Sequence, residues 1–283
     1  MKVLLSGGGT GGHITPILAL AAELKKQEPG CLIVYVGERK GAFKSLTSQS
    51  NNIDNQYGIF SGKFRRFYGE SWIRRLIDIK NHLKNLRDVV YVLIGFVQGF
   101  GILGREKPDV VFLKGGYVGV PIGLAAALKR IPIVTHDSDA IPGLANRIVS
   151  RWVALHAVAL PVDKYSYPRA KTKQVGVLVE DSYQPVSAES QVAYKRQLGL
   201  PEGDPVLLIT GGSSGAERIN IAVMKIVPEL LEKLPTLRII HQTGKNKAGI
   251  YKDYTHERLK VLEFLQPMHA YMGAADAVVC RAS

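Results

Sequence analysis

The sequence has few cysteines and no long uninterrupted apolar segment. Cys31 and Cys280 are the two cysteines among 283 residues. They cannot form a disulfide framework or a cysteine metal cluster, so we expect a reducing compartment. The longest apolar stretch, residues 89–103, is interrupted by glycine and glutamine. It is shorter than the roughly 18 residues that span a bilayer. The N-terminus lacks the apolar region of about 7–15 residues that a signal peptide needs. These absences argue against a secreted, disulfide-rich or membrane-spanning protein.

Positive charge is concentrated in the first part of the chain. The formal net charge is +13; residues 1–160 hold 21 Lys+Arg against 11 Asp+Glu, and residues 161–283 hold 16 against 13. The densest stretch, 63–87, has eight basic and two acidic residues. Such a basic field attracts nucleic acid, an anionic membrane or phosphorylated substrates, and charge alone does not choose among them.

The order of apolar runs and glycine turns predicts an α/β fold. A short apolar strand at 3–5 precedes a glycine-rich turn, a predicted helix at 16–26 and a second strand at 31–36. The pattern recurs from 109 and restarts at 205. We predict two Rossmann-like, doubly wound parallel-sheet domains facing a cleft. The predicted domains are residues 1–160 and 173–283, joined by a linker at 161–172. We expect the second domain to be incomplete, because the sequence stops after a predicted strand at 277–280.

The first glycine turn, GGGTGGH at residues 7–13, lies between a predicted strand and a predicted helix. Glycine lets the backbone approach a phosphate closely, and the helix N-terminus supplies N–H donors. His13 closes this turn. It is either a general base or a histidine that only hydrogen-bonds the turn or a phosphate.

Two further turns follow predicted strands, where ligands bind in open α/β sheets. KGGYVGVP begins at Lys114, and HDSD covers residues 136–139. The HDSD side chains are suited to bind sugar hydroxyls, to assist proton transfer, or simply to cap a helix. A third turn, GGSSGA at 211–216, is suited to a diphosphate at a helix N-terminus.

Residues 63–87 combine basic and aromatic side chains with an apolar stripe. The stripe comprises Trp72, Leu76, Ile79, Leu83 and Leu86 and has helical spacing. The stripe alone predicts a surface helix whose apolar face lies in the core. The aromatic and basic residues before it favour docking on an anionic membrane. Nucleic acid is the alternative, but no recognised nucleic-acid motif is present.

The motifs GGGTGGHITP, KGGYVGVP, HDSDAIPGLANR, GGSSGA and DAVVCRAS occur in one order along the chain. Together they resemble the MurG family of bacterial N-acetylglucosaminyltransferases. The resemblance implies a GT-B fold and an inverting transfer of GlcNAc from UDP-GlcNAc to the C4 hydroxyl of MurNAc in undecaprenyl-pyrophosphoryl-MurNAc-pentapeptide. It also implies a peripheral location at the cytoplasmic face of the cell membrane, with no metal, cofactor or nucleic acid.

The resemblance also implies site residues. It makes His13 and Asp137 the candidates for the catalytic base. The implied acceptor-binding residues are Gly8, Gly9, Thr10, Gly11, Gly12, Gly115, Gly116, Tyr117, His136 and Asp139. The implied donor-binding residues are Thr10, Gly11, Gly12, Gly212, Ser213, Leu265 and Arg281. The implied membrane-binding residues, which would contact anionic lipids, are Lys63, Arg65, Arg66, Phe67, Trp72, Arg74 and Arg75.

The sequence departs from the family pattern at several positions. HDSD stands where the family usually has HEQN, Ser214 where it has glutamine, and Glu180 where it has an arginine. The chain also ends before the family's S-E-x-x-x-x-G region. Other hypotheses therefore stay open. One is a related two-Rossmann transferase with another lipid acceptor, such as a diacylglycerol. Another is a protein that binds lipid-linked diphosphate and needs a separate donor-binding part.

Overall fold

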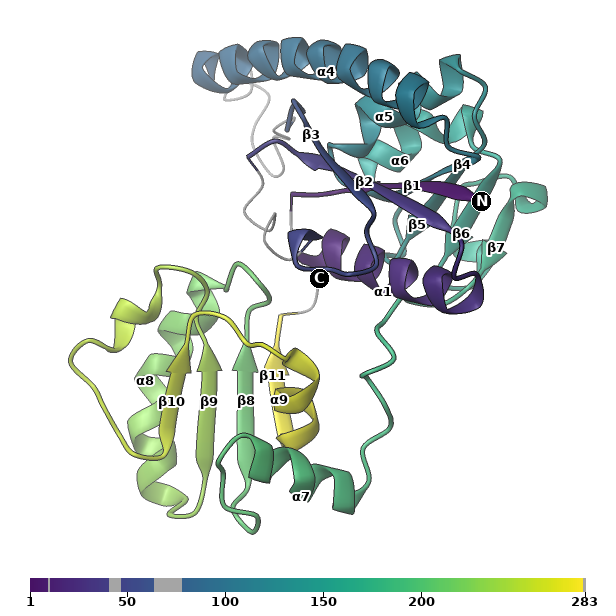
Figure 1. Ribbon diagram of the computed structural model, residues 1–283. Helices are drawn as coiled ribbons and strands as arrows, with labels where there is room; N and C mark the ends of the chain where they lie inside the picture. The colour runs from purple at the N-terminus through teal and green to yellow at the C-terminus, as the bar shows by residue number, and fades with distance from the viewer. Residues whose placement is uncertain (10, 41–46, 64–77, 282–283) are drawn as a thin grey trace. The chain divides into compact units, whose positions relative to one another are not determined.

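The chain divides into two compact α/β units. In a computed structural model, unit 1 is Met1–Glu180 and unit 2 is Asp181–Ser283. The structure describes residues 1–9, 11–40, 47–63 and 78–281. Each unit is built on a parallel sheet (Figure 1), as the sequence predicts. The division lies after Glu180, downstream of the expected linker at 161–172. The physical reason is that Thr172–Gln174 pairs in parallel with Leu155–Val158 and so extends the sheet of unit 1.

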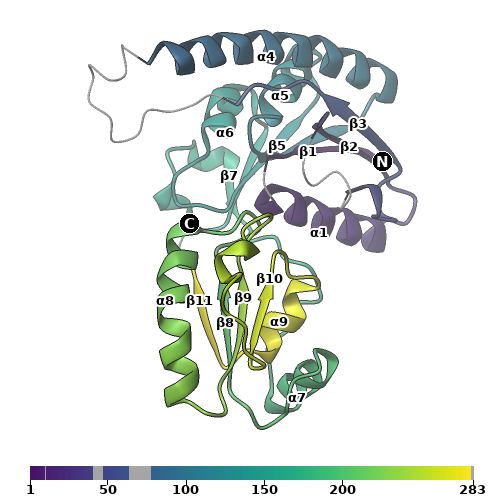
Figure 2. The ribbon, with the colours of Figure 1, turned by 90° about the vertical axis from the view of Figure 1, so that its left-hand side faces the viewer.

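Unit 1 has a seven-stranded sheet with the order β3-β2-β1-β4-β5-β6-β7. The strand order reverses between β1 and β4, which is the topological switch point where open α/β sheets bind ligands. Helix α1 covers one face, and α4, α5 and α6 lie on the other (Figures 1 and 2). The strands are β1 (Lys2–Gly7), β2 (Leu32–Glu38), β3 (Asn55–Ile59), β4 (Val110–Gly115), β5 (Ile133–Asp137), β6 (Leu155–Val158) and β7 (Thr172–Gln174). The helices are α1 (Gly11–Gln27), α4 (Ile79–Glu106), α5 (Gly119–Leu128), α6 (Leu144–Val149) and the 3-10 turns η1 (Ser150–Trp152), η2 (Val162–Lys164) and η3 (Arg169–Lys171).

Helix α4 packs closely at two glycines and exposes Leu83 and Leu86. A methyl group at Gly95 would lie 2.0 Å from the Phe60 carbonyl oxygen, and one at Gly99 would lie 2.9 Å from Ile122 Cδ1. Leu83 and Leu86 are 62% and 64% exposed. The expectation that this stripe lies in the core is therefore wrong for these two residues. Gly95 and Gly99 let the opposite face of the helix lie close against the rest of unit 1. Leu83 and Leu86 therefore point away from the core.

Helix α4 is also longer than the apolar run suggests. By length and composition alone, residues 81–106 are sufficient to cross a membrane, and 22% of the most apolar window is buried. The sequence estimate began only at residue 89 and so underestimated this length. One face of the helix nevertheless packs on the domain at Gly95 and Gly99. The length and apolar composition of α4 are therefore compatible both with a membrane-spanning helix and with a helix packed on unit 1.

Unit 2 has a four-stranded sheet with the order β10-β9-β8-β11. Its switch point lies between β8 and β11. Figure 2 shows α8 on one face and α7 and α9 on the other. Buried side chains of α8 pack on Ile209 and Ile239, and Tyr271 of α9 packs with Leu208 and Ile240. The strands are β8 (Val206–Thr210), β9 (Arg238–Gln242), β10 (Leu259–Leu262) and β11 (Ala277–Cys280); the helices are α7 (Ala188–Gln197), α8 (Glu217–Lys233), α9 (Met268–Ala274) and the 3-10 turn η4 (Ala248–Tyr251).

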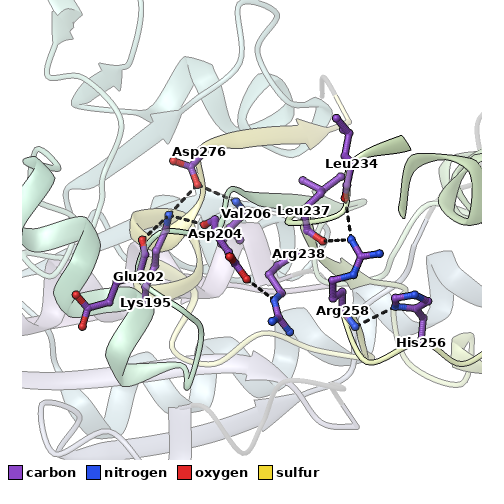
Figure 3. Close-up of polar contacts among 10 residues, drawn as sticks. All are labelled: Lys195, Glu202, Asp204, Val206, Leu234, Leu237, Arg238, His256, Arg258 and Asp276. Atoms are coloured by element: carbon purple, nitrogen blue, oxygen red, sulfur yellow. Dashed lines mark hydrogen bonds and ion pairs between the residues drawn. The ribbon is translucent and has the colours of Figure 1, made fainter. Parts of the chain in front are cut away.

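Ion pairs hold the end of unit 2 where its strands begin (Figure 3). The buried ammonium of Lys195 lies 3.0 Å from an Asp276 carboxylate oxygen, and the same oxygen accepts the Val206 N–H at 2.8 Å. Arg258 donates to the carbonyls of Leu231 and Leu234 and so caps the C-terminus of α8. These charges are satisfied within the unit, which leaves the opposite end of the sheet for ligands.

Candidate active site

Two glycine turns meet at the switch point of unit 1. Ser6 and Gly7 of β1 pair with Leu113 and Gly115 of β4, so the two strands end side by side. A methyl group at Gly116 would lie 2.5 Å from the Gly8 carbonyl oxygen. A methyl group at Gly9, whose φ is +91°, would lie 2.7 Å from the Tyr117 ring. Side chains larger than hydrogen do not fit at this contact, and the predicted acceptor turns are therefore adjacent.

Helix α1 begins inside the first turn. It starts at Gly11, so Gly11 and Gly12 belong to its first turn, which contains no acidic residue. The N–H groups and the positive dipole end of a 17-residue helix therefore lie beside the glycines. Thr10 lies outside the described residues.

His13 lies in the first turn of α1, next to the second glycine turn. A methyl group at Gly115 would be 3.7 Å from its Cδ2 atom. Burial lowers the pKa of His13, and the positive charge of Lys114 lowers it further; Asp139 and Asp137 act in the opposite direction. The neutral imidazole is the dominant form at pH 7, and a neutral imidazole is able to accept a proton.

Both carboxylate oxygens of Asp137 are engaged within unit 1. One oxygen accepts the Gly143 N–H at 3.0 Å and the other accepts the Tyr167 hydroxyl at 2.9 Å. The Tyr167 ring stacks on His156 with 3.7 Å between centroids. Asp137 therefore joins the loop after β5 to the segment that follows β6.

His136 is buried and its Nε2 lies 3.0 Å from the Gly176 carbonyl oxygen. Since a carbonyl only accepts, His136 must carry its proton on Nε2. Burial lowers the pKa of His136. The Tyr117 hydroxyl donates to a Glu38 carboxylate oxygen at 2.7 Å. Asp139 is exposed.

Sequence reasoning did not assign a role to Lys114 or to the contact between Glu38 and Tyr117. Lys114 is buried at the end of β4, immediately before the second pair of glycines. A cation next to a glycine pair was a usable signal. The Glu38 contact left no sequence signal, because the two residues lie 79 positions apart.

Unit 2 also has a glycine turn between a strand and a helix at the switch point of its sheet. The turn after β8 contains Gly212 at a φ of +80° and Gly215 at +66°. A methyl group at Gly215 would lie 1.9 Å from the Thr243 carbonyl oxygen. Helix α8 follows, and its N-cap residue, Ala216, makes no side-chain capping hydrogen bond. Ser213 is half-buried in the turn.

Arg281 reaches the unit 2 turn from the neighbouring strand. Cys280 pairs with Thr210, and a guanidinium nitrogen of Arg281 lies 4.0 Å from the position of a methyl group on Gly212. Leu265 is buried, with its side chain in the core between β8, β9 and α9. The structure therefore brings Arg281 and Gly212 together. It places the Leu265 side chain in the core, and the donor contact expected of the Leu265 backbone stays a prediction.

The expected membrane residues lie mostly outside the described part of the chain. Lys63 is described and exposed. The other six, Arg65, Arg66, Phe67, Trp72, Arg74 and Arg75, fall within 64–77. Among the described residues, no group of three or more His, Cys, Asp or Glu is arranged to hold a metal ion.

An apolar face continues along α4 beyond the stripe. Leu93 and Val97 are 60% and 69% exposed. Beside them is an open groove of about 570 Å³ lined by residues of α4 and α5, by Arg130 and by Trp152. The Arg151 guanidinium lies 4.3 Å from the Trp152 ring centroid. Apolar and cationic side chains therefore adjoin on this face.

Both units match models of one protein family. The N-terminal domain of glycosyltransferase family 28 matches residues 3–158, and its C-terminal domain matches residues 206–282. A crystal structure of Acinetobacter baumannii MurG aligns with 100% of this chain and 74% of its own, with a TM-score of 0.63 and 27% identity. The UDP-GlcNAc 2-epimerase of Neisseria meningitidis, bound to UDP-GlcNAc, has a TM-score of 0.62 at 16% identity, a likeness of fold alone.

The two parallel-sheet units thus form a GT-B-like architecture. The relative from Clostridium perfringens, a UDP-N-acetylglucosamine–N-acetylmuramyl-(pentapeptide) pyrophosphoryl-undecaprenol N-acetylglucosamine transferase, is 35% identical over 99% of this chain and 72% of its own length. A relative of the same name from Lachnospira eligens is 36% identical over 99% of this chain and 73% of its own length. The chain belongs to glycosyltransferase family 28 and is MurG-like.

Proposed function

We propose that the chain transfers GlcNAc from UDP-GlcNAc to the C4 hydroxyl of MurNAc in undecaprenyl-pyrophosphoryl-MurNAc-pentapeptide, with inversion at the anomeric carbon. Membership of the family and the names of the relatives support this reaction. The observation that carries it is the contact between the two glycine turns of unit 1, with His13 against Gly115. Two turns and a helix N-terminus suit an acceptor diphosphate, and the imidazole is then beside the reacting sugar.

In this proposal His13 is the general base. Its lowered pKa keeps the imidazole neutral, and a neutral imidazole can take the proton of the attacking hydroxyl. Asp137 is the less suitable base, because Gly143 and Tyr167 already donate to its two oxygens. Its role is to hold the loop that carries the HDSD residues.

The donor diphosphate binds in the unit 2 turn. The N–H groups at the start of α8 and the Ser213 hydroxyl donate to it, and Arg281 lies beside the same turn. As the bond to GlcNAc breaks, negative charge develops on the departing diphosphate. The helix dipole and the guanidinium stabilise that charge.

The test is a transfer assay with labelled UDP-GlcNAc and the lipid-linked MurNAc-pentapeptide, with the Clostridium perfringens relative as positive control. We expect label in the lipid product from the chain and its loss in His13→Ala. Label entering a diacylglycerol instead would show a different lipid acceptor. Absence of transfer under conditions where the relative is active would refute the proposed reaction.

We further propose that the chain binds the cytoplasmic face of the cell membrane peripherally, through the exposed apolar face of α4. Leu86, Leu93 and Val97 supply apolar surface, and Arg130 and Arg151 supply charge beside it. Apolar insertion and attraction to anionic lipids reinforce one another.

Co-sedimentation with phosphatidylglycerol-containing vesicles tests this location. The double variant Leu93→Gln/Val97→Gln should reduce binding by about tenfold or more, because two exposed aliphatic side chains that would enter the membrane are lost. The matched control is Ile221→Gln, an exposed apolar residue of α8, which should bind as the wild type does. Equal binding by all three proteins would exclude the α4 face as the contact.

A further inference from the structure

Lys114 is a buried cation at the end of β4, next to the glycine turns of unit 1. It is the penultimate residue of β4 and is 5% exposed. Its Nζ donates to the Ser138 hydroxyl at 3.0 Å. An ammonium carries three N–H donors. Within the described part of the chain, this single hydrogen bond is the one that the lysine makes.

The charge of Lys114 has no adjacent counter-charge in the described residues. No described carboxylate lies within the 4.0 Å of an ion pair, and the one partner, Ser138, is neutral. Asp137, whose charge acts on Lys114, has both oxygens engaged by Gly143 and Tyr167. Burial lowers the pKa of Lys114, and Asp137 and Asp139 oppose that effect from a greater distance. A buried ammonium without a counter-ion is costly, which points to an anion that arrives from outside.

Lys114 lies against glycines, where the backbone carries no side chain. Glycines flank it in space. A methyl group at Gly7 would lie 3.2 Å from Lys114 Cβ and 3.4 Å from the His13 carbonyl oxygen. A methyl group at Gly115 would lie 3.7 Å from the His13 ring and 3.7 Å from Asn146 Nδ2. His13 therefore adjoins both glycines, Lys114 adjoins Gly7 and precedes Gly115 in the chain, and Asn146 adjoins Gly115.

An unsatisfied acceptor independently marks the place as a ligand site. Asn146 is 1% exposed, and its Nδ2 donates to the His136 carbonyl oxygen at 3.1 Å. Its Oδ1 has no partner in the described residues and lies 3.8 Å from the methyl position at Gly115. Buried polar atoms are normally paired, so this oxygen is suited to a donor on a bound ligand. A cation and an acceptor on one patch match a ligand that carries both a phosphate and hydroxyls.

We propose that Lys114 binds a phosphate oxygen of the lipid-linked glycosyl acceptor, beside His13. The assignment rests on the proposed function and adds to it a specific cation, supplied by β4 and not by a glycine turn. Phosphate is held there by one charge-assisted hydrogen bond in addition to the N–H groups of α1.

Lys114 has a second effect through its charge. The described charged groups that act on His13 are Lys114, Asp137 and Asp139, and Lys114 is the cation among them. Its removal should raise the pKa of His13. A base with a higher pKa stays protonated up to a higher pH, so the acid limb of the pH–rate profile should move to higher pH.

Binding of inorganic pyrophosphate to the whole chain tests the assignment by equilibrium dialysis. Lys114→Met keeps the aliphatic stem and removes the charge, and it should weaken binding about tenfold. The matched control is Lys164→Met, which removes one exposed charge from the same unit and should stay within about twofold. Equal binding by Lys114→Met and the control would overturn the assignment.

Transfer assays give a second readout. Lys114→Met should raise the KM for the lipid acceptor more than the KM for UDP-GlcNAc, and it should move the acid limb to higher pH. A merely structural lysine would change neither the KM ratio nor the pH profile. If Lys114→Met does not fold, Lys114→Gln replaces it. In the wild type, pyrophosphate should then shift an NMR resonance of ε-¹³C-labelled lysine, and no shift would overturn the assignment.

The two proposals fail in different ways. If the wild type binds pyrophosphate through Lys114 but transfers no GlcNAc, the proposed reaction is wrong and the anion site stands. If transfer proceeds and Lys114→Met behaves as Lys164→Met does in every assay, the reaction stands and the Lys114 assignment is wrong.

Discussion

Each unit has a glycine turn between a strand and a helix at the switch point of its sheet, but different side chains surround the two turns. In each, a glycine turn follows the strand at the switch point and leads into a 17-residue helix. In unit 1 the turn is enclosed by Tyr117, with His13 and Lys114 adjoining it. In unit 2 the turn carries Ser213, and Arg281 lies beside it. The glycine turn and the helix N-terminus are by themselves suited to bind an anion. A proton acceptor has to come from a side chain, such as that of His13.

Histidines sharpen the same contrast. In unit 1, His13 lies in the site at the edge of a turn. In unit 2, His241 is fully buried, with Nδ1 2.8 Å from the Tyr251 hydroxyl and Nε2 3.2 Å from Asn220 Oδ1. Asn220 in turn donates to the Thr243 carbonyl oxygen at 2.8 Å. His13 is the proposed general base, whereas His241 supports the loop that packs against Gly215.

Replacing each of the two histidines should give the largest difference between the units, in kcat for His13 and in stability for His241. His13→Ala removes the proposed general base, and we expect kcat to fall about 10²–10⁴-fold with little change in stability. His241→Asn should instead lower the free energy of unfolding by about 1–3 kcal/mol. In properly folded His241→Asn protein, kcat should be close to that of the wild type. Steady-state kinetics with chemical denaturation measure both effects. A nearly normal kcat in His13→Ala would assign the base elsewhere.

Gly215→Ala should disrupt unit 2 and leave unit 1 intact. The new methyl group would lie 1.9 Å from the Thr243 carbonyl oxygen, at a φ of +66°. We expect a loss of about 3 kcal/mol or more from strain and clash together. The control is Gly249→Ala in the same unit, where nothing lies within 4 Å. Hydrogen exchange resolved by unit measures the effect, and equal protection in the two variants would contradict it.

Acid should weaken unit 2 partly through His241. Burial lowers the pKa of His241 to about 4. The unfolded chain therefore takes up the proton first as the pH falls. The stability that His241 contributes is complete above about pH 6.5 and is lost toward about pH 4. Denaturation at several pH values should show a smaller slope for His241→Asn than for His269→Asn in the same unit. Identical slopes would show that His241 titrates normally.

Ser213→Ala should give the smallest effect. One hydroxyl donor to a diphosphate is removed while the N-terminus of α8 remains, so we expect the KM for UDP-GlcNAc to rise about fivefold. The KM for the lipid acceptor should not change, because that ligand is assigned to unit 1. Initial rates at varied donor and acceptor concentrations separate the two constants. A larger change in the acceptor KM would reverse the assignment of the two units.

Local signals predicted much of the fold and the turns. The apolar runs at 3–5, 109–113 and 205–210 are buried strands, as parallel sheets require. The turns that follow the first two of these strands meet in space because parallel strands end at the same edge of a sheet. The boundary after Glu180 was not predictable in this way. Strand β7 has only three residues, and its pairing partner, not its composition, makes it a strand.

The sequence by itself determined the order of strands, turns and helices, since apolar periodicity and glycine act over a few residues. It also determined which side chains are available for chemistry. Only the tertiary structure decided their roles. It brought donors to both oxygens of Asp137, left Lys114 with one neutral partner among the described residues, and turned Leu83, Leu86 and Leu93 of α4 outward. Each outcome depends on how closely distant segments approach, as Gly95 does to Phe60. Closeness of packing is a property of the whole fold, and no local pattern encodes it.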